Sequence, residues 1–192
     1  MFLAGFLATL PIALSACRHE QPETGGSAIP PLRARASESN DLRFLDTMTA
    51  HHQRAVLMWQ DAVTHASHRE LRDFAAKAVE EQRREMFLIH LWRDRWFADA
   101  PSPAANSPTT ASERPALPQI KGSSFDQQFL AMMVPHHQQA AAMARSAVTS
   151  VESPEIRQLA QIIVDQQEEE VKTMQRWTRA WFPPHSAAER RQ

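Results

Sequence analysis

Residues 129–149, FLAMMVPHHQQAAAMARSAVT, repeat the pattern of residues 44–64, FLDTMTAHHQRAVLMWQDAVT. Both stretches carry a methionine, the triplet His-His-Gln, a second methionine and the triplet Ala-Val-Thr in the same order. The offset of 85 positions (129 minus 44) then holds without a gap through Trp96-Phe97 and Trp181-Phe182. A repeat of this length indicates a duplicated structural unit, so the fold should contain two copies of one set of elements.

The spacing of apolar residues predicts that each copy is helical. Phe44, Met48, Ala55 and Met58 recur at intervals of three, four and seven, and His51 occupies the position between Met48 and Ala55. This period places all of these side chains on one face of an amphipathic helix. The later part of each copy keeps the same rhythm, which predicts a second helix.

Turn signals divide each copy into two helices. Ser67 and Glu70 have the spacing of a capping box, and Ser153 precedes a proline at the first position of a helix. We therefore expect tight turns near residues 65–68 and 150–153. Two antiparallel hairpins, each with an apolar stripe that it cannot bury alone, should dock as an all-α four-helix bundle.

The composition excludes some functions. The chain has 192 residues, 43% of them hydrophobic, and 21 basic residues balance 22 acidic ones. A net charge of -1 provides no broad positive field to attract nucleic acid. Only four glycines occur, which favours helix over sheet.

The first residues have the pattern of an export signal. Residues 1–16 carry no charge, and Leu14-Ser15-Ala16-Cys17 resembles the lipobox of bacterial lipoproteins, in which the cysteine is lipidated. No Lys or Arg precedes the apolar run, which departs from the usual signal peptide. Cys17 is the only cysteine, so the sequence has no disulfide framework. We expect an exported, periplasmic or cell-envelope lipoprotein that meets the membrane only through its lipid anchor.

These signals divide the chain into consecutive segments, with both repeats in one domain. The predicted segments are a signal peptide with lipobox over 1–17, a flexible tether over 18–38, a first helical hairpin over 39–97, a Pro/Ser/Ala-rich linker over 98–123, a second helical hairpin over 124–183 and a tail over 184–192. The sequence leaves the oligomeric state open, a homo-oligomer included.

Polar residues interrupt the apolar stripe at its middle in both copies. Each predicted first helix carries adjacent histidines, and each second helix carries Gln-x-x-Glu on the corresponding face. Buried polar groups need partners, or they cost free energy. One interpretation is a hydrogen-bonded polar layer that fixes the register of a structural or partner-binding bundle. The other is a metal site.

The chemistry of these residues favours copper as the metal. Thioether sulfur together with imidazole suits copper, above all Cu(I), better than magnesium, calcium or manganese. Outside the cell a free thiolate is lost to oxidation, whereas methionine and histidine remain usable ligands. The candidate ligands are His51, His52, His136, His137, Met48, Met58, Met133, Met143 and Met174. The residues expected to orient the imidazoles are Gln82, Glu85, Gln167 and Glu170.

Other residues near these motifs carry less information. His65, His68 and His90 have no histidine counterpart in the second copy, so we interpret them as surface residues. Pro135 removes a backbone hydrogen bond and predicts a kink in the helix just before the second histidine pair. The first copy has Ala50 at this position, so the two halves need not bind metal equally well.

The second copy closely resembles the domain-of-unknown-function 305 family. The residues that carry the resemblance are Phe129, Leu130, Met133, Pro135, His136, His137, Ala140 and Met143, followed by Ile163, Gln167, Glu170, Val171, Met174 and Trp177. The resemblance implies a ferritin-like four-helix bundle built from two repeated antiparallel hairpins, export, and in some members copper binding and copper resistance. The first copy departs from the pattern at Ala50, Met86 and Ile89, which places its site in greater doubt.

The sequence gives no support to an enzyme. A ferritin-like di-iron oxidase needs Glu-x-x-His on two helices, and no glutamate in this chain has a histidine three residues later. No Gly-rich elbow accompanies the serines, so a hydrolase is not indicated either. We therefore predict a metal-binding protein without catalytic activity.

Overall fold

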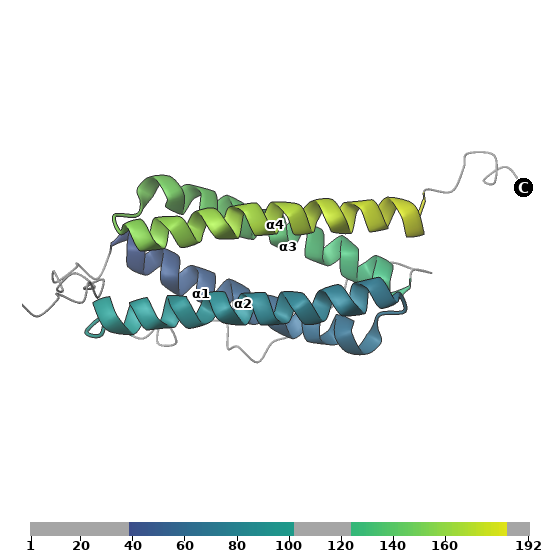
Figure 1. Ribbon diagram of the computed structural model, residues 1–192, viewed down its shortest axis with the longest axis horizontal. Helices are drawn as coiled ribbons and strands as arrows, with labels where there is room; N and C mark the ends of the chain where they lie inside the picture. The colour runs from purple at the N-terminus through teal and green to yellow at the C-terminus, as the bar shows by residue number, and fades with distance from the viewer. Residues whose placement is uncertain (1–38, 102–123, 184–192) are drawn as a thin grey trace, which may run out of the picture. The chain divides into compact units, whose positions relative to one another are not determined.

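A computed structural model describes residues 39–101 and 124–183 of the chain (Figure 1). Within these ranges the secondary structure is helical and contains no strand. The helices are α1 (Asn40–His65), α2 (Arg69–Trp96), α3 (Phe125–Ser150) and α4 (Pro154–Trp181). The prediction of an all-α four-helix bundle is thus confirmed. The predicted signal peptide, tether and tail, and residues 102–123 of the predicted linker, lie outside the described residues.

Equivalent residues begin the first helix of each copy. The hydroxyl of Ser39 accepts a hydrogen bond from the N–H of Leu42 at 3.2 Å, and that of Ser124 accepts one from the N–H of Gln127 at 3.3 Å. Such N-caps satisfy backbone donors that have no partner within the helix. Helix α3 continues through Pro135, so the proline does not end the helix.

The capping box predicted at Ser67 is wrong. The N-cap of α2 is His68, and its side chain makes no capping bond within the helix. The N–H groups of Ser67 and His68 instead donate to the carboxylate of Asp126, at 2.8 and 2.9 Å. Asp126 belongs to the other hairpin, and its carboxylate accepts the hydrogen bonds at the start of α2. The hydroxyl of Ser67 is therefore not needed as a cap.

Asp41 makes the matching contact at the other end of the bundle. It is fully buried and accepts hydrogen bonds from the N–H of Glu152 at 2.7 Å, the N–H of Ser153 at 3.1 Å and the hydroxyl of Ser153 at 2.5 Å. Asp41 and Asp126 are 85 positions apart, so they occupy equivalent places in the repeat. Each hairpin therefore supplies a carboxylate, here called an aspartate latch, to the turn of the other hairpin.

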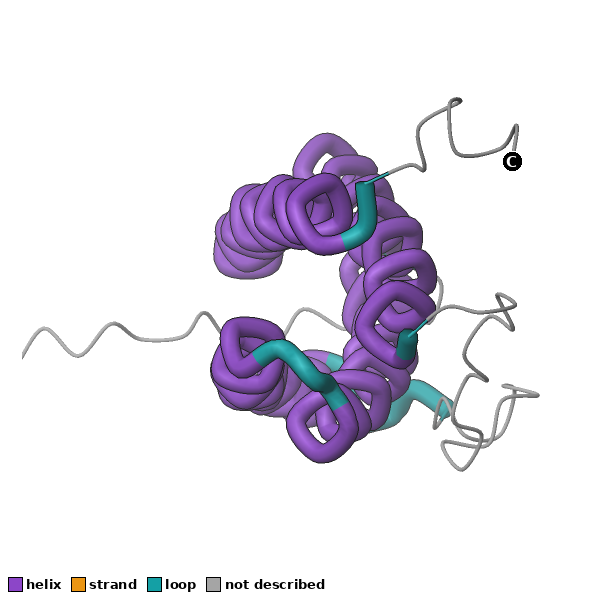
Figure 2. The backbone as a smooth tube through the Cα atoms, turned by 90° about the vertical axis from the view of Figure 1, so that its right-hand side faces the viewer, coloured by secondary structure: helices purple, strands orange, loops and turns teal. Residues whose placement is uncertain are grey.

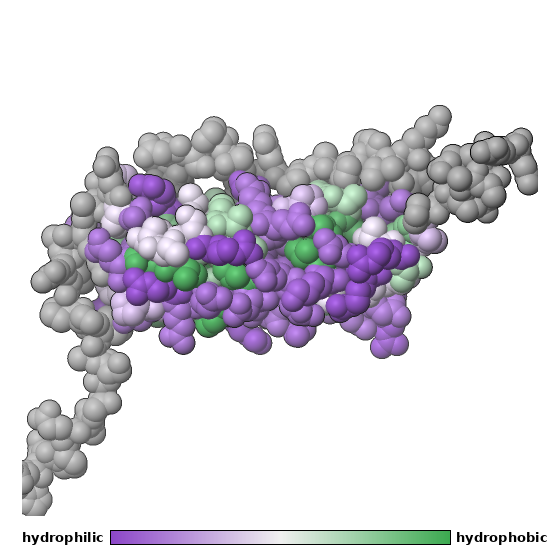
Figure 3. Space-filling view, turned by 90° about the horizontal axis from the view of Figure 1, so that it is seen from above, coloured by the Kyte–Doolittle hydropathy of each residue, from purple (hydrophilic) through white to green (hydrophobic). Residues whose placement is uncertain are grey.

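The helices pack in the order α2, α1, α3, α4, and Figure 2 views them nearly along their axes. Helices α1 and α3 are antiparallel, because Asp41 at the start of α1 contacts Ser153, just beyond the end of α3. The repeats are therefore related by an approximate two-fold axis that crosses the middle of α1 and α3. Hydrophilic side chains cover much of the outer face over α4 (Figure 3).

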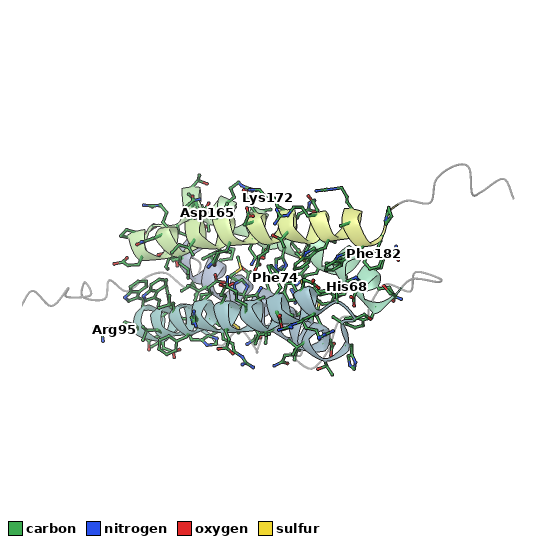
Figure 4. All side chains as sticks on the ribbon, turned by 45° about the vertical axis from the view of Figure 1, so that its right-hand side comes forward. His68, Phe74, Arg95, Asp165, Lys172 and Phe182 are labelled. Carbon is green, nitrogen blue, oxygen red and sulfur yellow. The ribbon has the colours of Figure 1, made fainter. Side chains whose placement is uncertain are left out.

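Aromatic residues join α2 and α4 at one end of the bundle. The rings of Phe74 and Trp177 lie edge to face with centroids 5.1 Å apart, and His68 stacks on Trp181 at 3.9 Å. Figure 4 shows His68, Phe74 and Phe182 toward this end. Aromatic pairs of this kind contribute about 0.5–1.5 kcal/mol each beyond the area that they bury.

Two apolar clusters form the core, and a polar layer lies between them. Met48 and Ile89 belong to the first cluster, whereas Met58, Met133 and Met174 belong to the second. Each fully buried side chain of this size contributes about 1.5–3 kcal/mol. Along α1 the two clusters are separated by the histidine pair, so the polar layer crosses the centre of the bundle.

Candidate metal centre

The centre of the bundle brings the two histidine pairs together. His51, His52 and His137 are buried, and His136 is half-buried. The rings of His51 and His136 have centroids 3.8 Å apart and planes inclined by 38°. These two residues are equivalent in the repeat, so their contact lies on the approximate two-fold axis. The histidines thus converge in one layer that both hairpins build.

The other two histidines contact carboxylates of their own hairpins. His52 Nε2 lies 2.6 Å from Oε2 of Glu85, and His137 Nε2 lies 2.8 Å from Oε2 of Glu170. The first contact is a hydrogen bond, whereas the second is a close charge contact without hydrogen-bond geometry. A carboxylate at Nε2 favours the tautomer with a proton there, which leaves Nδ1 with a free lone pair.

Gln82 and Gln167 are buried beside the histidine layer but make different contacts. Both are 2% exposed. The Nε2 of Gln167 donates to Oε2 of Glu170 at 3.3 Å, so it supports a carboxylate rather than an imidazole. Gln82 contributes an oxygen, Oε1, that has no hydrogen-bond partner.

Several imidazole nitrogens in the layer have no hydrogen-bond partner of acceptable geometry. These are both ring nitrogens of His51, His136 and His137, and Nδ1 of His52. A buried polar atom without a partner costs about 1–3 kcal/mol, so native structures contain few of them. Imidazole nitrogens with free lone pairs can bind a metal ion, which accepts electron pairs.

The pKa values of the two central imidazoles keep their lone pairs available. Burial, with a smaller contribution from the charge of His52, lowers the pKa of His51 from 6.5 to about 3. Burial, followed by the influence of His51, lowers the pKa of His136 to about 2. Both rings are therefore neutral near pH 7, which is the form that binds metals.

The predicted methionine ligands form two groups, one in each apolar cluster. Met48 belongs to the first cluster and the partly buried Met143 packs against it. Met58, Met133 and Met174 belong to the second cluster. Each group combines both copies, because the antiparallel docking places the start of α1 beside the end of α3. Ile89, which replaces the late methionine of the pattern, lies in the first cluster. The missing sulfur therefore weakens the ligand set at one end of the bundle and not within one copy, as the sequence suggested.

Nitrogen and oxygen donors alone do not complete a site in this arrangement. Among the described residues, no group of three His, Cys, Asp or Glu side chains lies close enough to hold a metal ion. A centre in this layer therefore depends on fewer nitrogen donors or on the methionine sulfurs beside it.

Some residues of this region could not be assigned from the sequence. Trp59 is fully buried, its Nε1 has no hydrogen-bond partner, and its ring centroid lies 5.4 Å from that of His137. Its counterpart in the second copy is Ala144, so the repeat gave no signal for it. His68 is half-buried with a side chain that is 35% exposed, and its Nδ1 lies 2.5 Å from Oδ2 of Asp126, a partner that the sequence did not indicate. His65 and His90 are exposed.

Comparisons with known proteins match this fold. The model of the family described as domain of unknown function (DUF305) matches residues 24–93 and 41–178. The structure of CopM in its Cu(I)-bound form is 31% identical, covers 74% of this chain and 97% of its own, and has a TM-score of 0.61. The Cu(II)-bound form of CopM is 34% identical with coverages of 74% and 98% and a TM-score of 0.62.

A structure with lower sequence identity has the same fold. A DUF305 fragment from Deinococcus radiodurans is 26% identical, covers 76% of this chain and 96% of its own, and has a TM-score of 0.58. No curated protein matches the chain. The names of these matches refer to metal-bound forms or to DUF305, and none names an enzymatic activity.

Proposed function

This chain belongs to the DUF305 family, and from that premise we propose that it binds and sequesters copper in the bacterial cell envelope through histidine and methionine ligands. One observation carries the proposal: buried imidazole nitrogens without hydrogen-bond partners lie in a layer with methionines on both sides. CopM, which has been solved with Cu(I), Cu(II) and silver, supports the choice of copper.

The residues of the layer have distinct roles in this proposal. His51 and His136 offer neutral imidazole nitrogens from the centre. His52 and His137 offer Nδ1, while Glu85 and Glu170 hold these rings and add negative charge that favours a cation. Copper would act there as a bound cargo, held by imidazole in either oxidation state and by thioether mainly as Cu(I).

A purely structural polar layer explains less of the geometry. Such a layer stabilises a bundle when its members satisfy one another, as His52 and Glu85 do. The nitrogens of His51 and His136 lack a carboxylate partner of this kind, so in a layer that never binds a ligand they would carry much of the cost of burying polar atoms. This observation favours the metal centre over the structural alternative.

Direct titration tests the proposal. Protein purified from copper-supplemented cells should contain copper by elemental analysis, and the apo protein should bind Cu(I) and Cu(II) in competition titrations. The fluorescence of Trp59 should also change when copper binds, because its ring lies beside that of His137. A protein that binds neither ion would support the structural alternative.

Methionine-to-leucine changes test the sulfur ligands. Met133→Leu and Met143→Leu each remove one sulfur, from different clusters, while they keep most of the packing volume. We expect Cu(I) affinity to fall by about tenfold, equivalent to about 1.4 kcal/mol. Cu(II) affinity should fall less, because imidazole suits the oxidised ion better. Competition titration of both ions measures the difference.

Met132→Leu is the matched control, because Met132 is a partly buried methionine of the same helix that is not a proposed ligand. Its Cu(I) affinity should equal that of the unchanged protein. Equal Cu(I) binding by all three variants would exclude Met133 and Met143 as copper ligands.

Export and lipidation are part of the proposed function. No helix in the described ranges is both long and apolar enough to cross a membrane. Cys17 lies outside those ranges, and Cys17→Ser should release the protein from the membrane fraction or leave it unprocessed, because lipidation requires the thiol. Immunoblots of cell fractions measure this, and unchanged fractionation would disprove the lipid anchor.

A further inference from the structure

The outer faces of α2 and α4 differ although the two helices are copies of one element. Phe87, Leu88 and Leu91 on α2 are 67%, 36% and 47% exposed. Their counterparts on α4, 85 positions later, are Lys172, Thr173 and Arg176. The repeat preserves the buried positions, but on the outer face of α2 large apolar groups occupy positions that are polar or charged on α4. Packing within the bundle does not account for this difference.

Two exposed arginines extend the apolar residues along the same face. Arg84, Phe87, Leu88, Leu91 and Arg95 are separated by three, four, seven and eleven residues from the first of them, which places all five within an arc of about 100°. This set, here called the α2 patch, extends for about 16 Å along the helix. An apolar centre with arginines at both ends is typical of helices that lie on a membrane surface, where the charged heads reach the lipid phosphates.

The patch lies at the end of the bundle where the described chain begins. Arg93 Nε donates to Oδ1 of Asp46 at 3.1 Å, which fixes the last turns of α2 beside the first turns of α1. Figure 4 shows Arg95 at the same end. Residues 18–38 can span at most about 70 Å, so a lipid on Cys17 would keep α2 within reach of a bilayer.

The outer face of α4 is less suited to a bilayer than the outer face of α2. Asp165 and Glu169 on α4 are exposed, and Glu168 is half-buried. At one position of the patch the charge differs in sign, because Arg84 on α2 corresponds to Glu169 on α4. The equivalent face of α4 carries Lys172 and Arg176, both paired with Glu169, and it lacks large apolar side chains. The α2 patch is therefore the face that offers a bilayer both apolar contact and positive charge.

We propose that the α2 patch is a membrane-contact surface that docks the bundle on anionic phospholipid, with α2 against the headgroups and α4 away from them. This contact is separate from the lipid anchor and does not depend on copper. It would set the orientation of the bundle rather than its attachment, since a few apolar residues and two arginines bind a membrane weakly.

Vesicle sedimentation tests the contact. The sample is residues 18–192, which lack the apolar leader and Cys17 but contain all four described helices. Vesicles of phosphatidylglycerol and phosphatidylethanolamine should bind this protein, and vesicles of phosphatidylcholine should bind it more weakly. The double change Phe87→Glu and Leu91→Glu should lower binding by about tenfold or more, and Arg84→Gln with Arg95→Gln by about fivefold for each charge.

Ile162→Glu is the matched control, because Ile162 is an exposed apolar residue on α4. Its binding should equal that of the unchanged sequence, and circular dichroism should show that every variant is folded. Equal vesicle binding by the control and the α2 double variant would overturn the proposal. The proposal would also be overturned if the protein does not bind vesicles but associates with itself, and if the α2 changes abolish this association. That result would identify a second copy of the chain as the partner.

Discussion

Replacement of both central histidines by leucine, His51→Leu with His136→Leu, is expected to raise the melting temperature of the copper-free protein while it lowers copper affinity by about 100-fold or more. The stability gain follows from the removal of buried nitrogens that have no hydrogen-bond partner. A gain of about 2 kcal/mol corresponds to about 4–8 °C for a protein of this size. The affinity loss follows from the removal of two proposed ligands. Calorimetry and competition titration measure the two effects.

This double variant separates the metal centre from a structural layer, because the two explanations predict opposite signs. If the histidines only stabilise the bundle, the variant should melt at a lower temperature and bind copper as before. His90→Leu, on the exposed face of α2, is the control for adventitious binding by surface imidazole and should change neither quantity.

The same histidines also make the stability depend on pH. Their pKa values are lowered to about 3 and about 2 in the folded protein, so between those values and 6.5 the unfolded chain binds more protons than the folded one. Stability should therefore fall as pH decreases from about 6.5, by up to about 1.4 kcal/mol per pH unit for each histidine. The advantage of the double leucine variant should grow between pH 7 and pH 5. A constant difference in melting temperature over this interval would contradict the shifted pKa values.

Loss of one aspartate latch should cause the largest decrease in stability. Asp41→Ala leaves the N–H groups of Glu152 and Ser153 and the hydroxyl of Ser153 without their acceptor in a buried turn. We expect the free energy of unfolding to fall by about 3–4 kcal/mol, since a hydrogen bond to a charged group contributes about 1.5–3 kcal/mol. Thermal and urea denaturation followed by circular dichroism measure this loss.

Controls for the latch exist within the chain. Asp73→Ala removes an exposed carboxylate that pairs with Arg69 one helical turn away, and such pairs contribute about 0.3–0.5 kcal/mol. Asp126→Ala should resemble Asp41→Ala, because its carboxylate accepts from equivalent donors at the other end. If Asp41→Ala is no less stable than Asp73→Ala, the latch does not hold the hairpins together.

The helices and their apolar faces could be predicted because the repeat and the helical period are local properties of the sequence. The helical period predicts that Met48 and Met58 lie on the buried face of one helix, and both are buried on α1. Their grouping with the methionines of the second copy could not be predicted, because it depends on which half of α3 each one meets. That pairing follows from the antiparallel docking of the hairpins, which the sequence pattern does not specify.

Contacts between the hairpins were missed for the same reason. Asp41 and Ser153 are 112 residues apart, so no local rule connects them. The serine that resembles a capping residue, Ser67, was assigned a local role that a distant carboxylate performs instead. The equal spacing of Asp41 and Asp126 was visible in the sequence, but its meaning required the docked structure.

The approximate two-fold axis through the histidine layer has a consequence for how such a protein can diverge. Two identical hairpins that meet as separate chains would have identical outer faces, and every substitution would appear twice. Covalent joining removes this constraint, so Phe87 can stand on one side of the axis where Lys172 stands on the other, while His51 and His136 remain matched at the centre. The outer face of one hairpin can thus become apolar while that of the other stays charged, which a symmetric assembly does not allow. The shared interior does not change.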